Sequence, residues 1–292
     1  MKYNINVTFA VIGGSRAYDL LQNGNINGER IGALQTPFGN SQPVYLIQNP
    51  QYDMLFLSRH GEKGYNITAP FVNYRANIYA LKELGVKQIV SWSGPGTINQ
   101  SYKIGEFVLA DDIVDETHGR ESTFYKNKGI GFIRQFPVFC PTLRNCIRYS
   151  LNNLLINFSE SGTYVCTQGP RLETAAEIRK YKSYGGALVG MTLVPEVFLA
   201  KELEMCYAAI CYVTNYAEGI LNRPFKAGEL FEGLSNDTDR KTVEKAVSKF
   251  PIIITEIAKN IKQQELICQC QSSMERYKIR GDIGTDWHEW VT

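Results

Sequence analysis

Three short turns in the sequence combine glycine with polar side chains that could bind an anion. They are Gly13-Gly14-Ser15, Ser58-Arg59-His60-Gly61 and Ser93-Gly94-Pro95-Gly96-Thr97. Glycine lets backbone N–H groups approach an anion closely, the Arg59 guanidinium offers paired donors, and the His60 imidazole could add a third. Taken alone, each could be an ordinary tight turn or a solvated surface pair. Because each follows an apolar run typical of a buried strand, we expect them to gather at one edge of an α/β sheet.

The stretch from Gly185 to Gly219 is predicted to be a βαβ unit. Ala187–Met191 and Cys206–Val213 have the apolar character of buried strands, and Pro195 opens a helix between them. Ligands bind at the carboxyl ends of parallel strands, where the amino ends of the following helices also point. We therefore look for a site in this stretch.

Polar residues stand where these strands end. Thr192 follows the first strand, Asn215 follows the second, and Glu196 lies at the start of the connecting helix. A further carboxylate, Glu173, follows a strand predicted over Gly162–Thr167. Glu173 either faces a ligand or serves as a first-turn carboxylate that stabilises a helix over 173–184, and the residues alone leave both interpretations open.

The remaining periodicity predicts a single α/β domain over residues 1–265. Further strands are expected at Val7–Ile12, 43–48, 53–58, Lys87–Trp92 and Glu106–Val114, and helices at Phe71–Leu84, Leu143–Phe158 and from about Thr238, the last kinked at Pro251. Residues 266–292 lack periodicity and are interpreted as a tail. Its Trp287 and Trp290 dock on the domain or on a neighbouring subunit, or belong to a loose end.

Composition narrows the function classes. The 292-residue chain is 44% apolar with a formal net charge of +2, which gives no electrostatic footprint for nucleic acid or an anionic membrane. No apolar run approaches the span of a bilayer, and seven scattered cysteines fit a reduced compartment, so we expect a cytoplasmic protein. Cys268-Gln269-Cys270 could form a tail disulfide or half a metal site, but two thiols alone define neither, and we interpret them as inert.

Four motifs resemble the trimeric purine nucleoside phosphorylase and methylthioadenosine phosphorylase family. They are Arg59-His60-Gly61, VNYRANIYALKELG at 72–85, GTYVCTQGPRLETAAE at 162–177 and GMTLVPEVFLAKE at 190–202. The match runs from Val11 to about Asn260. The resemblance implies one α/β domain with a central mixed β-sheet flanked by helices, a homotrimer, and phosphate-dependent cleavage of a purine N-glycosidic bond.

The resemblance also implies roles for individual residues. Phosphate would be bound by Ser15, Arg59, His60, Ser93, Gly94 and Thr192. Met191 would lie against the ribose, while Leu172, Glu173, Asn215, Tyr216 and Ala217 would line the base side. Asn215 is the expected catalytic residue, because it would hydrogen-bond N7 and O6 of the leaving purine. No metal or organic cofactor is implied, and inorganic phosphate is the co-substrate.

Glu173 and Asn215 favour the branch that acts on 6-oxopurine nucleosides such as inosine and guanosine, with methylthioinosine as a further candidate. The alternatives are a methylthioadenosine phosphorylase and a non-catalytic nucleoside-binding protein. Leu221–Phe231, expected near the ribose 5′ end, is apolar and has no histidine, so a 5′-methylthio group could be accepted. Phe132 from a neighbouring subunit could extend that apolar wall.

Overall fold

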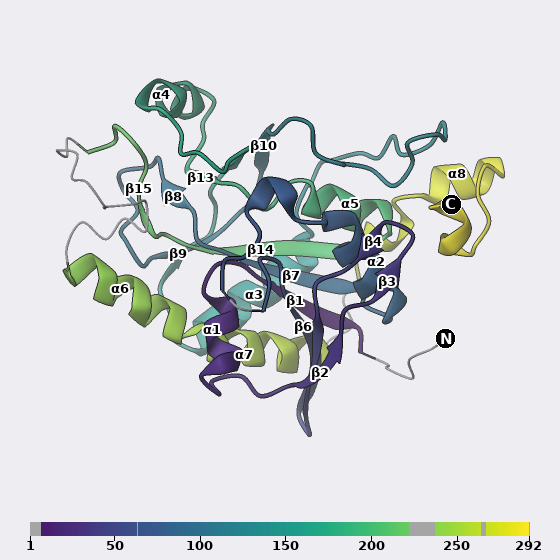
Figure 1. The fold of residues 1–292 in the computed structure, drawn as a ribbon, viewed down its shortest axis with the longest axis horizontal. Coiled ribbons are helices and arrows are strands. Elements are labelled where there is room, and N and C mark those ends of the chain that lie inside the picture. The colour runs from purple at the N-terminus through teal and green to yellow at the C-terminus, as the bar shows by residue number, and fades with distance from the viewer. Residues whose placement is uncertain (1–6, 63, 222–236, 264–266, 292) are drawn as a thin grey trace.

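An eight-stranded mixed β-sheet forms the centre of the molecule (Figure 1). The computed structural model describes residues 7–62, 64–221, 237–263 and 267–291. In spatial order the strands are β11 (Phe158–Ser159), β9 (Phe107–Leu109), β14 (Cys206–Tyr212), β7 (Gln88–Ser93), β1 (Phe9–Gly13), β6 (Tyr52–Ser58), β5 (Val44–Asn49) and β2 (Glu29–Gly32). β1 is parallel to β6 and β7, whereas β5 is antiparallel to β6. The predicted mixed sheet is confirmed.

A second, five-stranded sheet lies beside the first. Its strands in order are β10 (Ile113–Glu116), β12 (Tyr164–Thr167), β13 (Leu188–Gly190), β8 (Gly96–Thr97) and β15 (Asn215–Tyr216), and β3 (Gln35–Thr36) with β4 (Gly39–Asn40) forms a separate pair. The predicted βαβ unit is wrong, because β13 and β14 belong to different sheets, with α5 (Glu196–Glu202) between them in the chain. The single strand predicted over Glu106–Val114 is likewise two strands, β9 and β10, one in each sheet.

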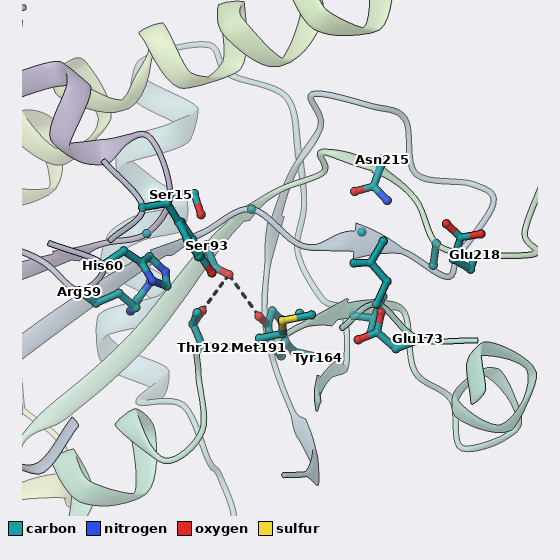
Figure 2. Close-up of a pocket in the computed structure, with 18 residues that line it drawn as sticks. Ser15, Arg59, His60, Ser93, Tyr164, Glu173, Met191, Thr192, Asn215 and Glu218 are labelled. Carbon is teal, nitrogen blue, oxygen red and sulfur yellow. Dashed lines mark hydrogen bonds between the residues drawn. The ribbon is translucent and has the colours of Figure 1, made fainter. Parts of the chain in front are cut away.

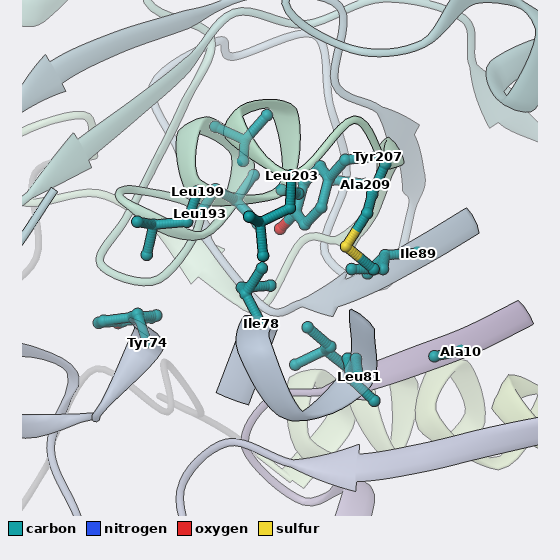
Figure 3. Packing of buried hydrophobic residues seen from close by; sticks show 14 of the residues in the cluster. Ala10, Tyr74, Ile78, Leu81, Ile89, Leu193, Leu199, Leu203, Tyr207 and Ala209 are labelled. Atoms are coloured by element: carbon teal, nitrogen blue, oxygen red, sulfur yellow. The ribbon is translucent and has the colours of Figure 1, made fainter. Parts of the chain in front are cut away.

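Helices cover both faces of the large sheet, because its central strands are apolar on both sides. β1 sends Ala10 and Ile12 into one core and Phe9 and Val11 into the other. The first core is covered by α2 (Tyr74–Glu83), which follows η1 (Ala69–Phe71), and by α5; Figure 3 shows Ile78 and Leu81 of α2 facing Leu199 and Leu203 of α5. The second core is covered by α1 (Ala17–Gln22), α3 (Pro141–Asn153), α6 (Asp237–Ser248) and α7 (Phe250–Gln263). The small sheet packs against α4 (Ala175–Ser183).

The long helix expected from Thr238 is two helices, α6 and α7, that meet at Lys249. Pro251 lies in the first turn of α7 and not inside a continuous helix. Proline lacks a backbone N–H, and the first turn is where that group has no helical partner. The predicted kink is therefore a break.

The end of the chain packs on the domain. It contains η2 (Cys270–Ser272), α8 (Glu275–Arg280) and η3 (Trp287–Trp290). Trp290 lies in the same core as α2 and α5, and Trp287 meets Tyr79 of α2 edge to face at 4.9 Å between ring centroids.

Across the described residues, none of the helices combines the length and apolar character needed to cross a membrane.

Candidate active site

The three polar turns meet at one edge of the large sheet, which confirms the predicted convergence. Gly13 at the end of β1 is in register with Ser58 at the end of β6, and Ile12 with Ser91 of β7. A pocket opens there and is lined by eleven residues predicted from the sequence, which are Ser15, Arg59, His60, Ser93, Gly94, Leu172, Glu173, Met191, Thr192, Asn215 and Ala217. Tyr216 follows Asn215 in β15 and is not part of this lining.

The pocket has two chemically different ends. Figure 2 shows Ser15, Arg59 and His60 at one end and Glu173, Asn215 and Glu218 at the other, with Met191 between them. The first end carries hydroxyl and cationic groups, and the second carries carboxylates and an amide. This division matches a ligand with an anion at one end and a ring with polar edges at the other.

Three hydroxyl groups meet near the middle of the pocket. Ser93 Oγ lies 3.3 Å from the Tyr164 hydroxyl and 3.4 Å from Thr192 Oγ1 (Figure 2). Trp92, the neighbour of Ser93, points to the opposite face of β7 and packs against Phe250 at 4.3 Å between centroids. Trp92 is therefore not part of the pocket lining.

Gly14 is required by close packing. A β-carbon at this position would lie 2.7 Å from the Trp92 carbonyl oxygen and 3.1 Å from Arg59 Nη1. Neither partner is a flexible chain end, since one is backbone and the other is a fully buried guanidinium. The first turn thus brings its backbone up against Arg59, and the approach of its N–H groups to an anion stays a prediction.

Arg59 does not present its paired donors to the pocket, which corrects the expectation of a bidentate anion contact. Its Nε and Nη2 donate to the two carboxylate oxygens of Glu196 at 3.0 and 2.7 Å. Nη2 also donates to Ser91 Oγ at 2.6 Å, and Nη1 donates to the Trp92 carbonyl at 3.2 Å. Both members of the ion pair are buried, so Glu196 orients and neutralises Arg59. Of the five guanidinium N–H groups, one on Nη1 remains for a ligand.

His60 is a neutral imidazole whose proton is on Nδ1. Nδ1 lies 2.8 Å from the carbonyl oxygen of Ile67, which can only accept. Burial, together with the nearby positive charge of Arg59, lowers the pKa of His60 from 6.5 to about 3. Nε2 is therefore an acceptor, not the donor expected from the sequence, and Tyr65 stacks on the ring at 4.1 Å between centroids.

Because the pKa of His60 is lowered in the folded state, we expect His60 to make the folded protein less stable in acid. Below pH 6.5 the unfolded chain binds a proton that the folded chain excludes until about pH 3, so stability falls as the pH falls through this window. We expect His60 alone to reduce the free energy of unfolding by about 2 kcal/mol between pH 7.5 and 5. Urea titrations in phosphate-free buffer at several pH values would measure it. The His60→Asn variant should lack this component, and parallel pH profiles for the two proteins would contradict the prediction.

Glu173 is free to face a ligand because another pair of residues caps its helix. α4 begins at Ala175, with Thr174 accepting from the Glu177 backbone N–H at 3.2 Å and the Glu177 carboxylate accepting from the Thr174 N–H at 2.7 Å. The helix predicted over 173–184 is therefore shorter, and Glu173 is not in its first turn. The Thr167 hydroxyl donates to Glu173 Oε1 and orients the carboxylate.

Asn215 is held by its neighbours on both ends of its amide. Its Oδ1 lies 2.6 Å from Thr214 Oγ1, and its Nδ2 donates to the Tyr216 carbonyl oxygen at 3.1 Å. An amide has two donor hydrogens and two acceptor lone pairs, so one of each remains for a ligand. These two hydrogen bonds fix the orientation of the side chain and leave part of its hydrogen-bonding capacity for a ligand.

Arg120, which the sequence reasoning missed, holds together the two loops that carry Glu173 and Thr192. Its guanidinium donates to the carbonyl oxygens of Thr167 and Gln168 at 3.0 and 2.6 Å, and to those of Met191 and Val194 at 2.7 and 2.6 Å. A planar group with five donors suits this task. It lies in a polar loop after β10 and no motif marks it.

The pocket also includes residues without a predicted role. They are Tyr65, Tyr164, Val189, Gly190 and Glu218, while Gly14 and Gly96 of the predicted turns complete the lining. Glu218 directly follows the recognised Asn215–Ala217 segment, and that adjacency was the only available signal. Of the predicted 5′ wall, residues 222–231 lie outside the described residues, and Phe132 is 82% exposed and outside the pocket lining.

Comparison with known proteins extends these observations. The sequence profile of the phosphorylase superfamily matches residues 9–259. The chain is 39% identical over 273 residues to the 6-oxopurine nucleoside phosphorylase of Pyrococcus furiosus, covering 91% of this chain and 97% of the relative. It is 37% identical over 277 residues to the S-methyl-5′-thioadenosine phosphorylase of Thermofilum pendens, covering 94% and 99%. The structure of methylthioadenosine phosphorylase from Schistosoma mansoni in complex with tubercidin superposes with a TM-score of 0.80 at 27% identity, covering 92% and 97%.

Proposed function

This chain belongs to the phosphorylase superfamily, and we propose that it cleaves 6-oxopurine nucleosides with inorganic phosphate. It is a glycosyltransferase of the purine nucleoside phosphorylase type. The proposed substrates are inosine, guanosine and methylthioinosine, and the products are the free base and the corresponding ribose 1-phosphate. The observation that carries this proposal is the pairing of Glu173 with Asn215 at one end of the pocket.

The two side chains complement the edge of a 6-oxopurine. Such a base offers O6 as an acceptor and N1–H as a donor, and an ionised carboxylate can only accept. Glu173 would accept from N1–H, while the Asn215 amide would donate to O6 and accept from a protonated N7. As the glycosidic bond stretches, negative charge develops towards N7 and O6, so Asn215 would stabilise the departing base.

The opposite end of the pocket suits hydrogen phosphate. Ser15, Ser93 and Thr192 supply hydroxyl donors, and Arg59 supplies one N–H. HPO₄²⁻ also carries one P–OH donor, and the Nε2 lone pair of neutral His60 would accept it. The bound dianion acts as the nucleophile at C1′ and as a counter-charge for the oxocarbenium-like ribose. The proposed reaction involves no metal ion or organic cofactor.

A methylthioadenosine phosphorylase is the second candidate, because relatives of that name match 94% and 92% of the chain. A panel of inosine, guanosine, adenosine, methylthioadenosine and methylthioinosine, assayed with and without phosphate, separates the candidates. We expect phosphate-dependent cleavage of the three 6-oxopurine nucleosides to be fastest. Faster cleavage of methylthioadenosine would favour the second candidate, and binding without turnover would indicate a nucleoside-binding protein.

We also propose that the protein works as a homotrimer in the cytoplasm. Phe132 and Phe136 are 82% and 77% exposed in the single chain, and a neighbouring subunit would cover them. The protein is expected to elute near three times its 33.0 kDa chain mass, as measured by size-exclusion chromatography with light scattering. A fully active monomer would contradict this assembly.

A further inference from the structure

Four cysteine side chains from three separate parts of the chain meet at one point. Cys140 is the N-cap of α3, Cys206 is the first residue of β14, and Cys268 and Cys270 lie at η2. Their Sγ atoms all lie within 4.8 Å of one another. Cys140 and Cys206 are buried and the other two are partly buried. None of the four lines the candidate active site.

The spacing fits a single tetrahedral metal ion. A zinc–thiolate bond of about 2.3 Å places neighbouring sulfurs of a tetrahedron about 3.8 Å apart, so the most distant sulfurs need to approach by no more than about 1 Å. An iron–sulfur cluster spreads its thiolates over several irons and would require a wider cage. Four sulfur ligands select zinc among the common divalent ions, and a site closed by four protein ligands is structural.

The sulfurs are not covalently paired in the structure. All seven cysteines are free, and the Cys206 and Cys268 sulfurs are 3.2 Å apart, well beyond the disulfide bond length of about 2.05 Å. The other three cysteines, Cys146, Cys166 and Cys211, lie outside the cluster. The fold therefore separates the thiols into one group of four and three isolated residues.

The surroundings would support the negative charge of such a site. Four thiolates around Zn²⁺ carry a net charge of −2. The ammonium group of Lys201 lies within electrostatic reach of Cys140 and Cys270 and is anchored by donation to the Pro137 carbonyl oxygen at 2.8 Å. The backbone N–H of Leu143 donates to Cys140 Sγ at 3.5 Å. An N–H···S hydrogen bond is a contact of the kind that stabilises a ligand of a structural metal.

We propose that Cys140, Cys206, Cys268 and Cys270 bind one structural zinc ion. Each thiol loses its proton to solvent when the metal binds. The ion fastens the segment that begins at residue 267 to α3 and β14. Because β14 belongs to the large sheet and α3 covers its second face, the site anchors the end of the chain to the opposite side of the sheet from Trp290.

The metal content of the wild-type protein tests the proposal directly. Protein produced in zinc-supplemented medium is expected to retain about one zinc ion per chain by elemental analysis. After removal of zinc, added Co²⁺ should give the intense visible absorption of a tetrahedral tetrathiolate complex. Protein that retains no zinc and does not take up Co²⁺, or in which thiol titration shows these cysteines joined in disulfides, would overturn the proposal.

Variants with a matched control locate the site. Cys268→Ser with Cys270→Ser should reduce bound zinc from about one ion to less than about a tenth of an ion per chain and speed proteolysis after residue 267. Phosphorolysis should persist. Cys146→Ser, which changes a buried thiol of α3 outside the cluster, should retain the zinc. A double variant that keeps its full zinc content would contradict the assignment. If either variant does not fold, the zinc content and Co²⁺ spectrum of the wild-type protein test whether the site binds a metal.

Discussion

Replacement of Arg59 by alanine is expected to lower the free energy of unfolding by about 3–5 kcal/mol, because it leaves a buried carboxylate without its partner. Glu196 is 1% exposed and receives two of the hydrogen bonds of Arg59. Phosphorolysis should fall sharply at the same time, since the pocket loses the free Arg59 N–H and the negative charge of Glu196 is left unbalanced beside the anion. Urea unfolding measures the first effect, and phosphate saturation kinetics measure the second.

A second variant separates these two effects. Arg59→Met combined with Glu196→Gln removes both charges and keeps an acceptor for the Tyr207 hydroxyl, which lies 2.6 Å from Glu196 Oε1. The double variant should recover most of the stability that Arg59→Ala loses, but its phosphorolysis activity should remain low. Unchanged phosphate kinetics in Arg59→Ala would refute the anion role. Equal stability of the two variants would refute the ion pair as the cause of the loss.

Exchange of the base-reading pair is expected to move the substrate preference towards 6-aminopurine nucleosides. Adenine presents the N1 lone pair to Glu173, which leaves a desolvated carboxylate unpaired, and a loss of about 3 kcal/mol corresponds to roughly a 150-fold preference for 6-oxopurines. Asn215→Asp with Glu173→Ser should remove most of that preference. The ratio of kcat/KM for inosine to that for adenosine measures it.

Glu177→Ser is the matched control for this exchange. It removes a carboxylate four residues from Glu173 that caps α4 and lies outside the pocket lining. Stability should fall by about 1 kcal/mol, and the inosine-to-adenosine ratio should stay the same. A wild-type enzyme that prefers methylthioadenosine, or a double variant with the wild-type ratio, would show that Glu173 and Asn215 do not read the base.

The sequence predicted the large sheet and most of the pocket because both depend on local signals. Apolar runs that end in Gly13, Ser58 and Ser93 mark strands, and parallel strands must end at one edge. Local patterns also contain a signal for the start of α4. Thr174 followed by Glu177 is the spacing of a capping box, and it would have placed Glu173 before the helix.

Other features depend on contacts between distant residues. Arg59 and Glu196 are 137 positions apart, so the sequence could not show that the guanidinium was already paired. Periodicity marks β13 and β14 as strands but not as members of different sheets. Cys268-Gln269-Cys270 offered only half a metal site in the sequence, and only the fold brings Cys140 and Cys206 to it.

The use of two sheets has a consequence for how this enzyme could acquire new specificities. Ser15 and His60 follow strands of the large sheet and Ser93 ends one, whereas Glu173, Asn215 and also Thr192 belong to the small sheet or to the loops after its strands. Substitutions that alter base choice can therefore accumulate on the small-sheet side while Ser15, His60 and Ser93 stay unchanged on the large sheet. Since changes at independent sites combine nearly additively in free energy, selection, in nature or in the laboratory, could adjust the two properties in separate steps.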